Sequence, residues 1–243
     1  MTISATSAAQ PYRLNVLSTR RPLLLCALTA TRVWIESGLR PLSPSREWAG
    51  AKMTEFPDWF SAYAKTNFEK YLIPLAGQDN LQFLQLGVYT GDASIWMLQN
   101  IKNIRLTDVD TWLGSDEDAH KNMDFDDVYK TYTNKIKDYK VNICRATTIG
   151  YLLAQYGCDR PLGEYFDFIY IDADHTAAGV LLDAELSWDL LKSGGIMAFD
   201  DYEWGAHLPP SKSPKLGINL FIERHQGEFI TLEVGLQYWI QKL

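Results

Sequence analysis

Two short apolar stretches of the sequence end in carboxylates. Residues 166–175 run from Phe through Asp-Phe-Ile-Tyr-Ile to two aspartates and a histidine, and residues 195–201 end in two adjacent aspartates. If the two stretches are neighbouring strands, their acids surround one crevice. Carboxylates brought together in this way repel each other unless a cation is present. The acids of this expected cluster are Asp172, Asp174, Asp200 and Asp201.

The apolar part of each stretch must position these acids. A run of four to eight apolar residues with β-branched and aromatic members is typical of a central parallel strand, which helices cover on both faces. In open α/β sheets, ligands bind at the carboxyl ends of the strands. The acids therefore follow these strands at the edge where a ligand is expected.

Composition limits the class of protein. The chain has 243 residues, of which 47% are hydrophobic and 22% charged, and its net charge is −7. This charge argues against a nucleic-acid surface, which needs clustered Lys and Arg, and no apolar run reaches the ~20 residues of a membrane span. The three cysteines (Cys26, Cys144 and Cys158) show no CxxC spacing, which favours free thiols in a reducing compartment and hence a cytoplasmic protein.

The first 52 residues differ from the rest of the chain. They hold six arginines and one lysine against two acids. An Arg-rich, acid-poor start can be a targeting segment, but it lacks a clean cleavage site. We expect residues 1–52 to be a poorly ordered extension, translated upstream of a start at Met53 or used for targeting, and residues 53–243 to form a single domain.

Residues 53–243 alternate between the two patterns of an α/β protein. Strands are expected at 81–86, 103–110, 141–145, 166–171 and 195–199, with helices between them and with Ser193-Gly-Gly195 ending the helix that begins at Ala177. Residues 228–235 and 236–241 are typical of an antiparallel hairpin. The predicted fold is α/β, a doubly wound, Rossmann-like and mostly parallel seven-stranded sheet with a C-terminal antiparallel hairpin.

A glycine loop follows the first strand. Its spacing, Gly87-x-x-x-Gly91, lacks the glycine that lets a backbone approach a pyrophosphate, so it favours a nucleoside cofactor without a diphosphate. Asp110 ends the second strand and is placed to accept hydrogen bonds from ribose hydroxyls. Tyr89, inside the loop, is a second candidate contact.

Three motifs in this order resemble those of class I S-adenosylmethionine-dependent methyltransferases. Gln85-Leu-Gly-Val-Tyr-Thr-Gly91 resembles their first motif, especially in cation-dependent O-methyltransferases of the catechol and caffeoyl-CoA type. Tyr170-Ile-Asp-Ala-Asp-His175 and Ala198-Phe-Asp-Asp-Tyr202 resemble the later motifs, and look still more like the macrocin-type sugar O-methyltransferases. Gln85 stands where this family usually has a glutamate. Glutamine keeps the hydrogen-bond acceptor of the side chain but loses its negative charge. The cofactor-binding residues that the resemblance implies are Gln85, Gly87, Val88, Tyr89, Gly91, Asp110 and Asp174.

The resemblance also implies a metal site and a base. Asp172, Asp200 and Asp201 would bind a divalent cation, and an all-oxygen set favours Mg²⁺, with Mn²⁺ or Ca²⁺ as alternatives. A cation acidifies a bound hydroxyl and fixes its position. His175 matches the lysine proposed as base in the catechol-type enzymes, and an imidazole can accept a proton near neutral pH. The alternatives are carboxylates that act without metal and a histidine that only caps a helix or orients substrate.

The sequence thus predicts a methyltransferase acting on a hydroxyl of a sugar or small natural product, with S-adenosylmethionine and Mg²⁺ and with Asp172 and His175 in catalysis. No nucleic-acid or membrane partner is expected, and a homo-oligomer is left open. Three alternatives stay open: a metal-independent methyltransferase, an NAD-linked oxidoreductase, and a non-catalytic nucleoside-binding protein on the same scaffold.

Overall fold

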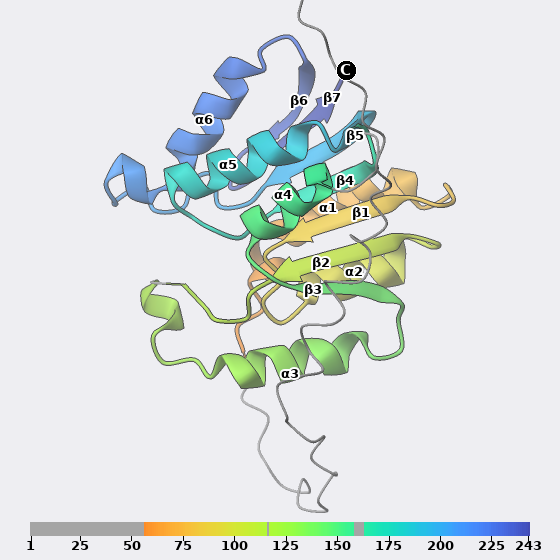
Figure 1. Cartoon of the computed structure of the whole chain (residues 1–243), viewed down its shortest axis with the longest axis vertical. Helices are drawn as coiled ribbons and strands as arrows, with labels where there is room; N and C mark the ends of the chain where they lie inside the picture. Colours follow the sequence, from red (N-terminus) through yellow and green to blue (C-terminus); the bar gives the residue numbers. More distant parts are fainter. Residues whose placement is uncertain (1–55, 116, 158–162) are drawn as a thin grey trace, which may run out of the picture. The chain divides into compact units, whose positions relative to one another are not determined.

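The computed structural model describes residues 56–115, 117–157 and 163–243. Within them the chain forms a seven-stranded sheet in the order β3-β2-β1-β4-β5-β7-β6, with helices on both faces (Figure 1). The first five strands are parallel, and β7 pairs antiparallel with β5 and with β6. The predicted fold class is confirmed, including the antiparallel pair at the end. The predicted extension, residues 1–52, lies outside the described residues.

The strands occupy nearly the predicted positions. Their bounds are β1 (Gln82–Leu86), β2 (Arg105–Asp110), β3 (Val141–Arg145), β4 (Phe166–Ile171), β5 (Leu191–Phe199), β6 (Phe229–Val234) and β7 (Tyr238–Lys242). The strand order reverses direction between β1 and β4, which is the point where open α/β sheets bind ligands.

Six α-helices cover the sheet in the described part of the chain. They are α1 (Lys65–Leu72), which follows a π-helical turn (Phe60–Ala64), α2 (Asp92–Asn100), α3 (Phe125–Ile136), α4 (Thr148–Gly157), α5 (Ala177–Trp188) and α6 (Pro214–Arg224). None of the helices in this part is long and apolar enough to cross a membrane.

Alternation along the strands creates two apolar layers. On β1, Leu84 and Leu86 pack with α4, α5 and α6, while Phe83 packs with α1 and α2 on the opposite face. A third cluster joins Val88 and Trp112 to the buried face of α3. Successive strand side chains point to opposite faces, so both faces of this strand are covered, as is usual for a central strand of a parallel sheet.

One predicted boundary is wrong. Ser193-Gly-Gly195 does not end α5 but lies inside β5, because the helix stops at Trp188 and Leu191 already pairs with Phe166 of β4. The register between these strands shifts after Phe166. A Cβ at Gly195 would lie 2.8 Å from the Lys192 carbonyl oxygen. These glycines therefore serve an irregular strand start, where two backbones approach closely.

Candidate active site

A cavity of about 1280 Å³ lies along the carboxyl ends of the parallel strands. It extends from residues after β5, such as Asp201 and Trp204, to residues 146–149 after β3, and it reaches the glycine loop on the way. Its size exceeds that of a typical pocket for one small ligand. The space is therefore sufficient for two substrates side by side.

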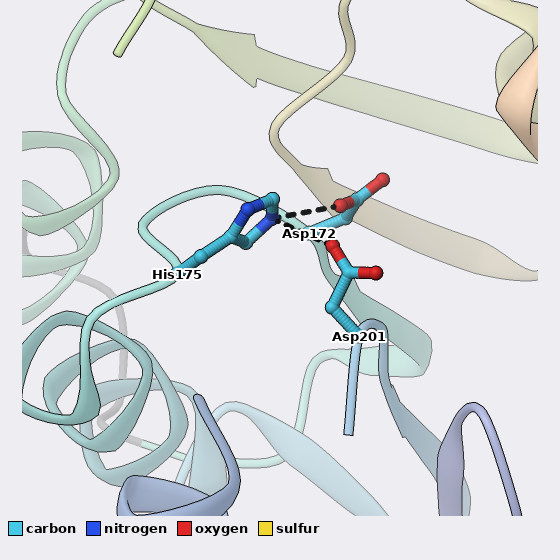
Figure 2. Close-up of side chains that lie close together, drawn as sticks. All are labelled: Asp172, His175 and Asp201. Carbon is cyan, nitrogen blue, oxygen red and sulfur yellow. Dashed lines mark hydrogen bonds and ion pairs between the residues drawn. The ribbon is translucent and has the colours of Figure 1, made fainter. Parts of the chain in front are cut away.

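Three ionisable side chains meet at one end of this cavity. His175 Nε2 lies 3.3 Å from Asp172 Oδ1 and 3.2 Å from Asp201 Oδ2, as Figure 2 shows. Asp172 follows β4, Asp201 follows β5, and His175 lies in the turn before α5. One donor atom from each of the three lies within 4.8 Å of the others, which is a spacing that a single divalent cation can bridge.

The pKa values of all three side chains are raised. Burial and the charge of Asp200 raise the pKa of Asp172 to about 7, and burial raises the pKa of Asp201 to about 6. The pKa of His175 lies well above its usual value, since Asp172 and Glu117 outweigh the opposing effect of burial. These neighbours therefore favour the charged form of the histidine. In the structure, the imidazole of His175 offsets the repulsion between Asp172 and Asp201. A bound cation would have the same effect, so the two carboxylates fit a cation.

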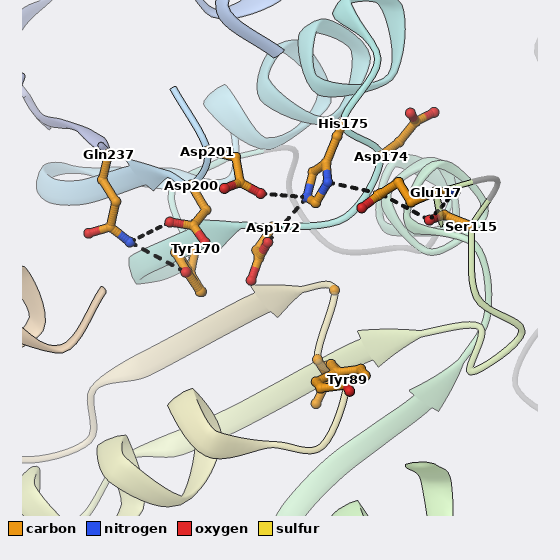
Figure 3. A network of polar contacts seen from close by, with 12 residues as sticks. Tyr89, Ser115, Glu117, Tyr170, Asp172, Asp174, His175, Asp200, Asp201 and Gln237 are labelled. Atoms are coloured by element: carbon orange, nitrogen blue, oxygen red, sulfur yellow. Dashed lines mark hydrogen bonds and ion pairs between the residues drawn. The ribbon is translucent and has the colours of Figure 1, made fainter. Parts of the chain in front are cut away.

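Asp200, the third predicted ligand, takes part in a different contact. Its Oδ1 accepts a 2.7 Å hydrogen bond from Gln237 Nε2, and the same amide also reaches the hydroxyl of Tyr170 at 3.4 Å (Figure 3). Burial and Asp201 raise the pKa of Asp200 to about 6. The structure therefore gathers Asp172, His175 and Asp201 most closely, and leaves Asp200 beside them in contact with the β6–β7 turn.

Sequence reasoning missed Glu117 as a site residue. Its Oε1 lies 3.0 Å from His175 Nδ1, on the side of the ring opposite to the two aspartates (Figure 3). Glu117 comes from the acid-rich stretch after β2, which could be interpreted as a solvated face or as a lid. No local motif distinguishes it from the neighbouring acids, and only the fold brings it to the histidine.

The glycine loop is built around Asp110. The Oδ2 atom of Asp110 accepts hydrogen bonds from Val88 N at 2.8 Å and Tyr89 N at 3.0 Å, and its Oδ1 accepts one from Trp112 N at 2.7 Å. Gly87 has φ +82°, and a Cβ there would lie 1.8 Å from the carbonyl oxygen of Asp172. Glycine is therefore required where β1 passes next to β4.

Two predicted cofactor contacts lie outside the cavity lining. Gln85 is 2% exposed; its Nε2 donates to the Gly87 carbonyl and its Oε1 accepts from Ser94 Oγ, both at 3.0 Å. Gly91 precedes α2 with φ +78°, and a Cβ there would lie 2.6 Å from the Tyr132 ring. Both residues hold the loop in its shape. The remaining predicted contacts, Gly87, Val88, Tyr89, Asp110 and Asp174, line the cavity.

Asp174 points away from the histidine cluster (Figure 3). Its Oδ1 accepts a 2.8 Å hydrogen bond from Thr176 N, and its carboxyl group lies where a Cβ of Gly179 would be. Asp174 therefore covers the first turn of α5. Asp174 is therefore not part of the group formed by Asp172, His175 and Asp201.

Aromatic rings form part of the cavity wall. Trp59 stacks on Tyr89 with ring centroids 4.8 Å apart, and His120 lies on Tyr89 at 6.2 Å. Trp59 is 37% exposed. Tyr89 and Trp112 have φ of 53° and 48°, and Asp201 has 56°. Such conformations are rare for bulky residues and concentrate at functional sites.

The chain was compared with known proteins. Residues 84–202, just under half of the chain, match the family model described as a methyltransferase domain. A curated relative, the uncharacterized protein R132 of Acanthamoeba polyphaga mimivirus, is 27% identical over 139 residues, which are 55% of this chain and 58% of that protein. The chain thus spans little more than half the length of this relative. The match to a methyltransferase domain covers β1 to the acids after β5, which is the region that holds the three motifs.

Solved structures share the fold. An O-methyltransferase from Bacillus cereus, in complex with S-adenosylhomocysteine, superposes with a TM-score of 0.52 at 16% identity, over 79% of this chain and 84% of its own. A putative O-methyltransferase from Klebsiella pneumoniae gives 0.54 at 17% identity, over 76% and 83%. At such identities the likeness shows the fold alone, and the cavity residues must carry the chemistry.

Proposed function

We propose that this chain transfers a methyl group from S-adenosylmethionine to a hydroxyl group of a sugar or another small natural product, with the help of a divalent cation. The observation that carries the proposal is the juxtaposition of two groups in one cavity. A glycine loop suited to a nucleoside lies beside a cluster of acids and a histidine suited to activating a hydroxyl. The methyltransferase match over residues 84–202 supports the first half of this statement.

The cofactor would lie along the strand ends with its ribose at Asp110. Oδ1 of this residue accepts one backbone hydrogen bond and Oδ2 accepts two, and a carboxylate has about four lone-pair sites. The backbone bonds fix the orientation of Asp110 and leave capacity for a ribose hydroxyl. Asp172 follows the strand next to β1, so the sulfonium end of the cofactor belongs beside the acidic cluster.

The residues of the cluster would hold a cation and the acceptor hydroxyl. Asp172 and Asp201 would supply carboxylate oxygens, with Asp200 completing the set, or His175 if it binds the cation instead of acting as the base. A bound cation supplies Lewis acidity, which lowers the pKa of the acceptor hydroxyl. The hydroxyl oxygen then attacks the methyl carbon, the carbon–sulfur bond breaks, and S-adenosylhomocysteine leaves. Alignment of the two reactants supplies much of the rate enhancement.

His175 would act as the proton acceptor when the cation is bound. In the arrangement observed, Asp172 and Glu117 raise the pKa of the imidazole and favour its charged form. A cation held by this cluster would favour loss of the ring proton. His175 could then accept the proton of the hydroxyl through Nε2, with Glu117 fixing the ring through Nδ1.

A metal-independent methyltransferase is the second candidate. The ion contacts of His175 with Asp172 and Asp201 favour it, since they satisfy these acids without a metal. In that case the charged histidine would orient the acceptor and the aspartates would accept its proton.

Isothermal titration with S-adenosylhomocysteine, with Mg²⁺ and with EDTA, tests the proposal. We expect saturable binding in both conditions, and methyl transfer from a labelled donor to sugar or catechol acceptors only with Mg²⁺. Turnover that persists in EDTA would select the metal-independent candidate. Absence of binding in either condition would contradict the proposed function as a whole.

A further inference from the structure

Another buried acid, outside the histidine cluster, faces the same cavity. Asp183 lies on α5 and is 1% exposed, yet it lines the cavity together with Gly179, which is one helical turn earlier. Within the part of the chain that the structure describes, neither of its carboxylate oxygens has a hydrogen-bond partner. Nearly all buried polar groups in proteins are paired, so this acid needs an explanation.

The burial of Asp183 makes the lack of a hydrogen-bond partner energetically unfavourable. Burial raises the pKa of Asp183 to about 7. The Thr148 hydroxyl lies near enough to oppose this rise in part, but it makes no hydrogen bond of ordinary geometry to either oxygen. Leaving a buried polar group without a partner destabilises a protein, and more so when the group is charged. A partner donating N–H groups from the cavity would remove this cost. Asp183 therefore has the chemistry of a residue that meets a ligand.

The end of the cavity at which Asp183 lies can be assigned, and this step rests on the proposed function. The sulfonium end of the cofactor belongs near Asp172, and the ribose belongs at Asp110. The base must then extend beyond β2, toward the residues that follow β3. Lining residues in that direction are 146–149 at the start of α4, and Gly179 and Asp183 of α5, which packs against α4.

We propose that Asp183 recognises the adenine base of S-adenosylmethionine by accepting a hydrogen bond from its exocyclic 6-amino group. The amino group is the N–H donor on the edge of the base, and a buried acceptor is suited to selecting it. A site built to bond a polar group of its ligand rejects analogues that lack the group, because the acceptor is then left unpaired. Asp183 is thus a specificity-determining residue at the cofactor end.

The test compares S-adenosylhomocysteine with S-inosylhomocysteine, in which a keto oxygen replaces the amino group, by isothermal titration. For the unmodified chain we expect about 10- to 100-fold weaker binding of the inosine form. Asp183→Ala should reduce this preference to about threefold or less, mainly through weaker binding of S-adenosylhomocysteine. Asp183→Asn should also reduce it, because its amide can donate to the keto oxygen. Asp189→Ala, at the exposed end of the same helix, is the matched control and should keep the full preference.

Thermal unfolding without ligand separates recognition from a structural role. If Asp183 serves a ligand, Asp183→Ala removes an unpartnered buried acid and should leave the Tm unchanged or raised. A lower Tm together with an equal loss of both ligands would show a structural acid and overturn the inference. Retention of the preference in both variants would overturn it too. An unmodified chain that binds both forms equally refutes this inference alone, whereas one that binds neither refutes the proposed function.

Discussion

Two regions of the cavity hold carboxylates in opposite ways. At the glycine loop, Asp110 accepts hydrogen bonds from three backbone N–H groups, those of Val88, Tyr89 and Trp112. In the acidic cluster, Asp172 and Asp201 both contact Nε2 of His175, and burial raises the pKa of both acids. The first carboxylate is fixed by the backbone, while the other two depend on the side chain of His175.

This difference shows how one sheet edge can serve two chemical tasks. Backbone N–H groups hold a loop in one shape and need no ion, so the cofactor end is formed in advance. Acids that repel each other store unfavourable energy that a cation or proton relieves, so the acidic end responds to its occupant. The comparison leads to three predictions, from the largest expected effect to the smallest.

The largest effect should come from the loop. Gly87→Ala places a Cβ 1.8 Å from the Asp172 carbonyl oxygen at a backbone φ of +82°. We expect it to lower the free energy of unfolding by more than about 3 kcal/mol, or to prevent folding. Urea unfolding measures the change. The control is Gly77→Ala, where a Cβ meets nothing within 4 Å and the expected change is under about 1 kcal/mol. Equal stability of the two variants would show that the loop is not fixed in advance.

A smaller effect should come from the acidic end, on turnover and not on folding. Asp201→Asn removes one charge from the group formed with Asp172 and His175. We expect Mg²⁺-dependent methyl transfer to fall roughly 100-fold, since a metal's contribution amounts to several kcal/mol. The affinity for S-adenosylhomocysteine, measured by titration, should change little.

Asp200→Asn sharpens this result. A loss equal to that of Asp201→Asn would assign the three-aspartate ligand set, whereas a clearly smaller loss would assign His175 as the third ligand, with Asp200 held by Gln237. Unchanged turnover in both variants would remove the metal from the mechanism.

The smallest effect should appear in the pH dependence of stability. The raised pKa values of Asp172 (about 7), Asp200 and Asp201 (about 6) mean that the folded state holds protons that the unfolded state loses above about pH 4. Their contribution to stability therefore falls as pH rises from about 4 to 7. His175 acts in the same direction, because its raised pKa stabilises the fold at low pH and this gain is lost on deprotonation.

The expected result is a Tm in EDTA that is several degrees lower at about pH 8 than at about pH 5.5. Mg²⁺ should reduce this difference, because a bound cation replaces the protons that the cluster loses. Differential scanning calorimetry at both pH values measures it. A Tm that rises with pH in EDTA would show that the acids are not held close together in solution.

Much of the fold could be predicted from local patterns. Continuous apolar runs such as 166–171 indicated buried parallel strands, and the alternation with helices indicated a doubly wound sheet. The start of β5 was missed because Gly194 and Gly195 are typical of a helix end, while their pairing with β4 depends on contacts distant in sequence. The cavity lining at Asp110, Asp172 and Asp201 followed from a simple rule, since parallel strands end at one edge.

By itself, the sequence determined which residues follow each strand and therefore which acids share the edge of the sheet. Only the tertiary structure decided which of these acids meet. It brought Glu117 to His175 from a loop without a motif, turned Asp200 toward Gln237, and placed Asp183 in the cavity lining with no hydrogen-bond partner among the described residues. The physical reason is that strand periodicity fixes the direction of a side chain locally, whereas its partner depends on how loops and helices pack across the sheet edge.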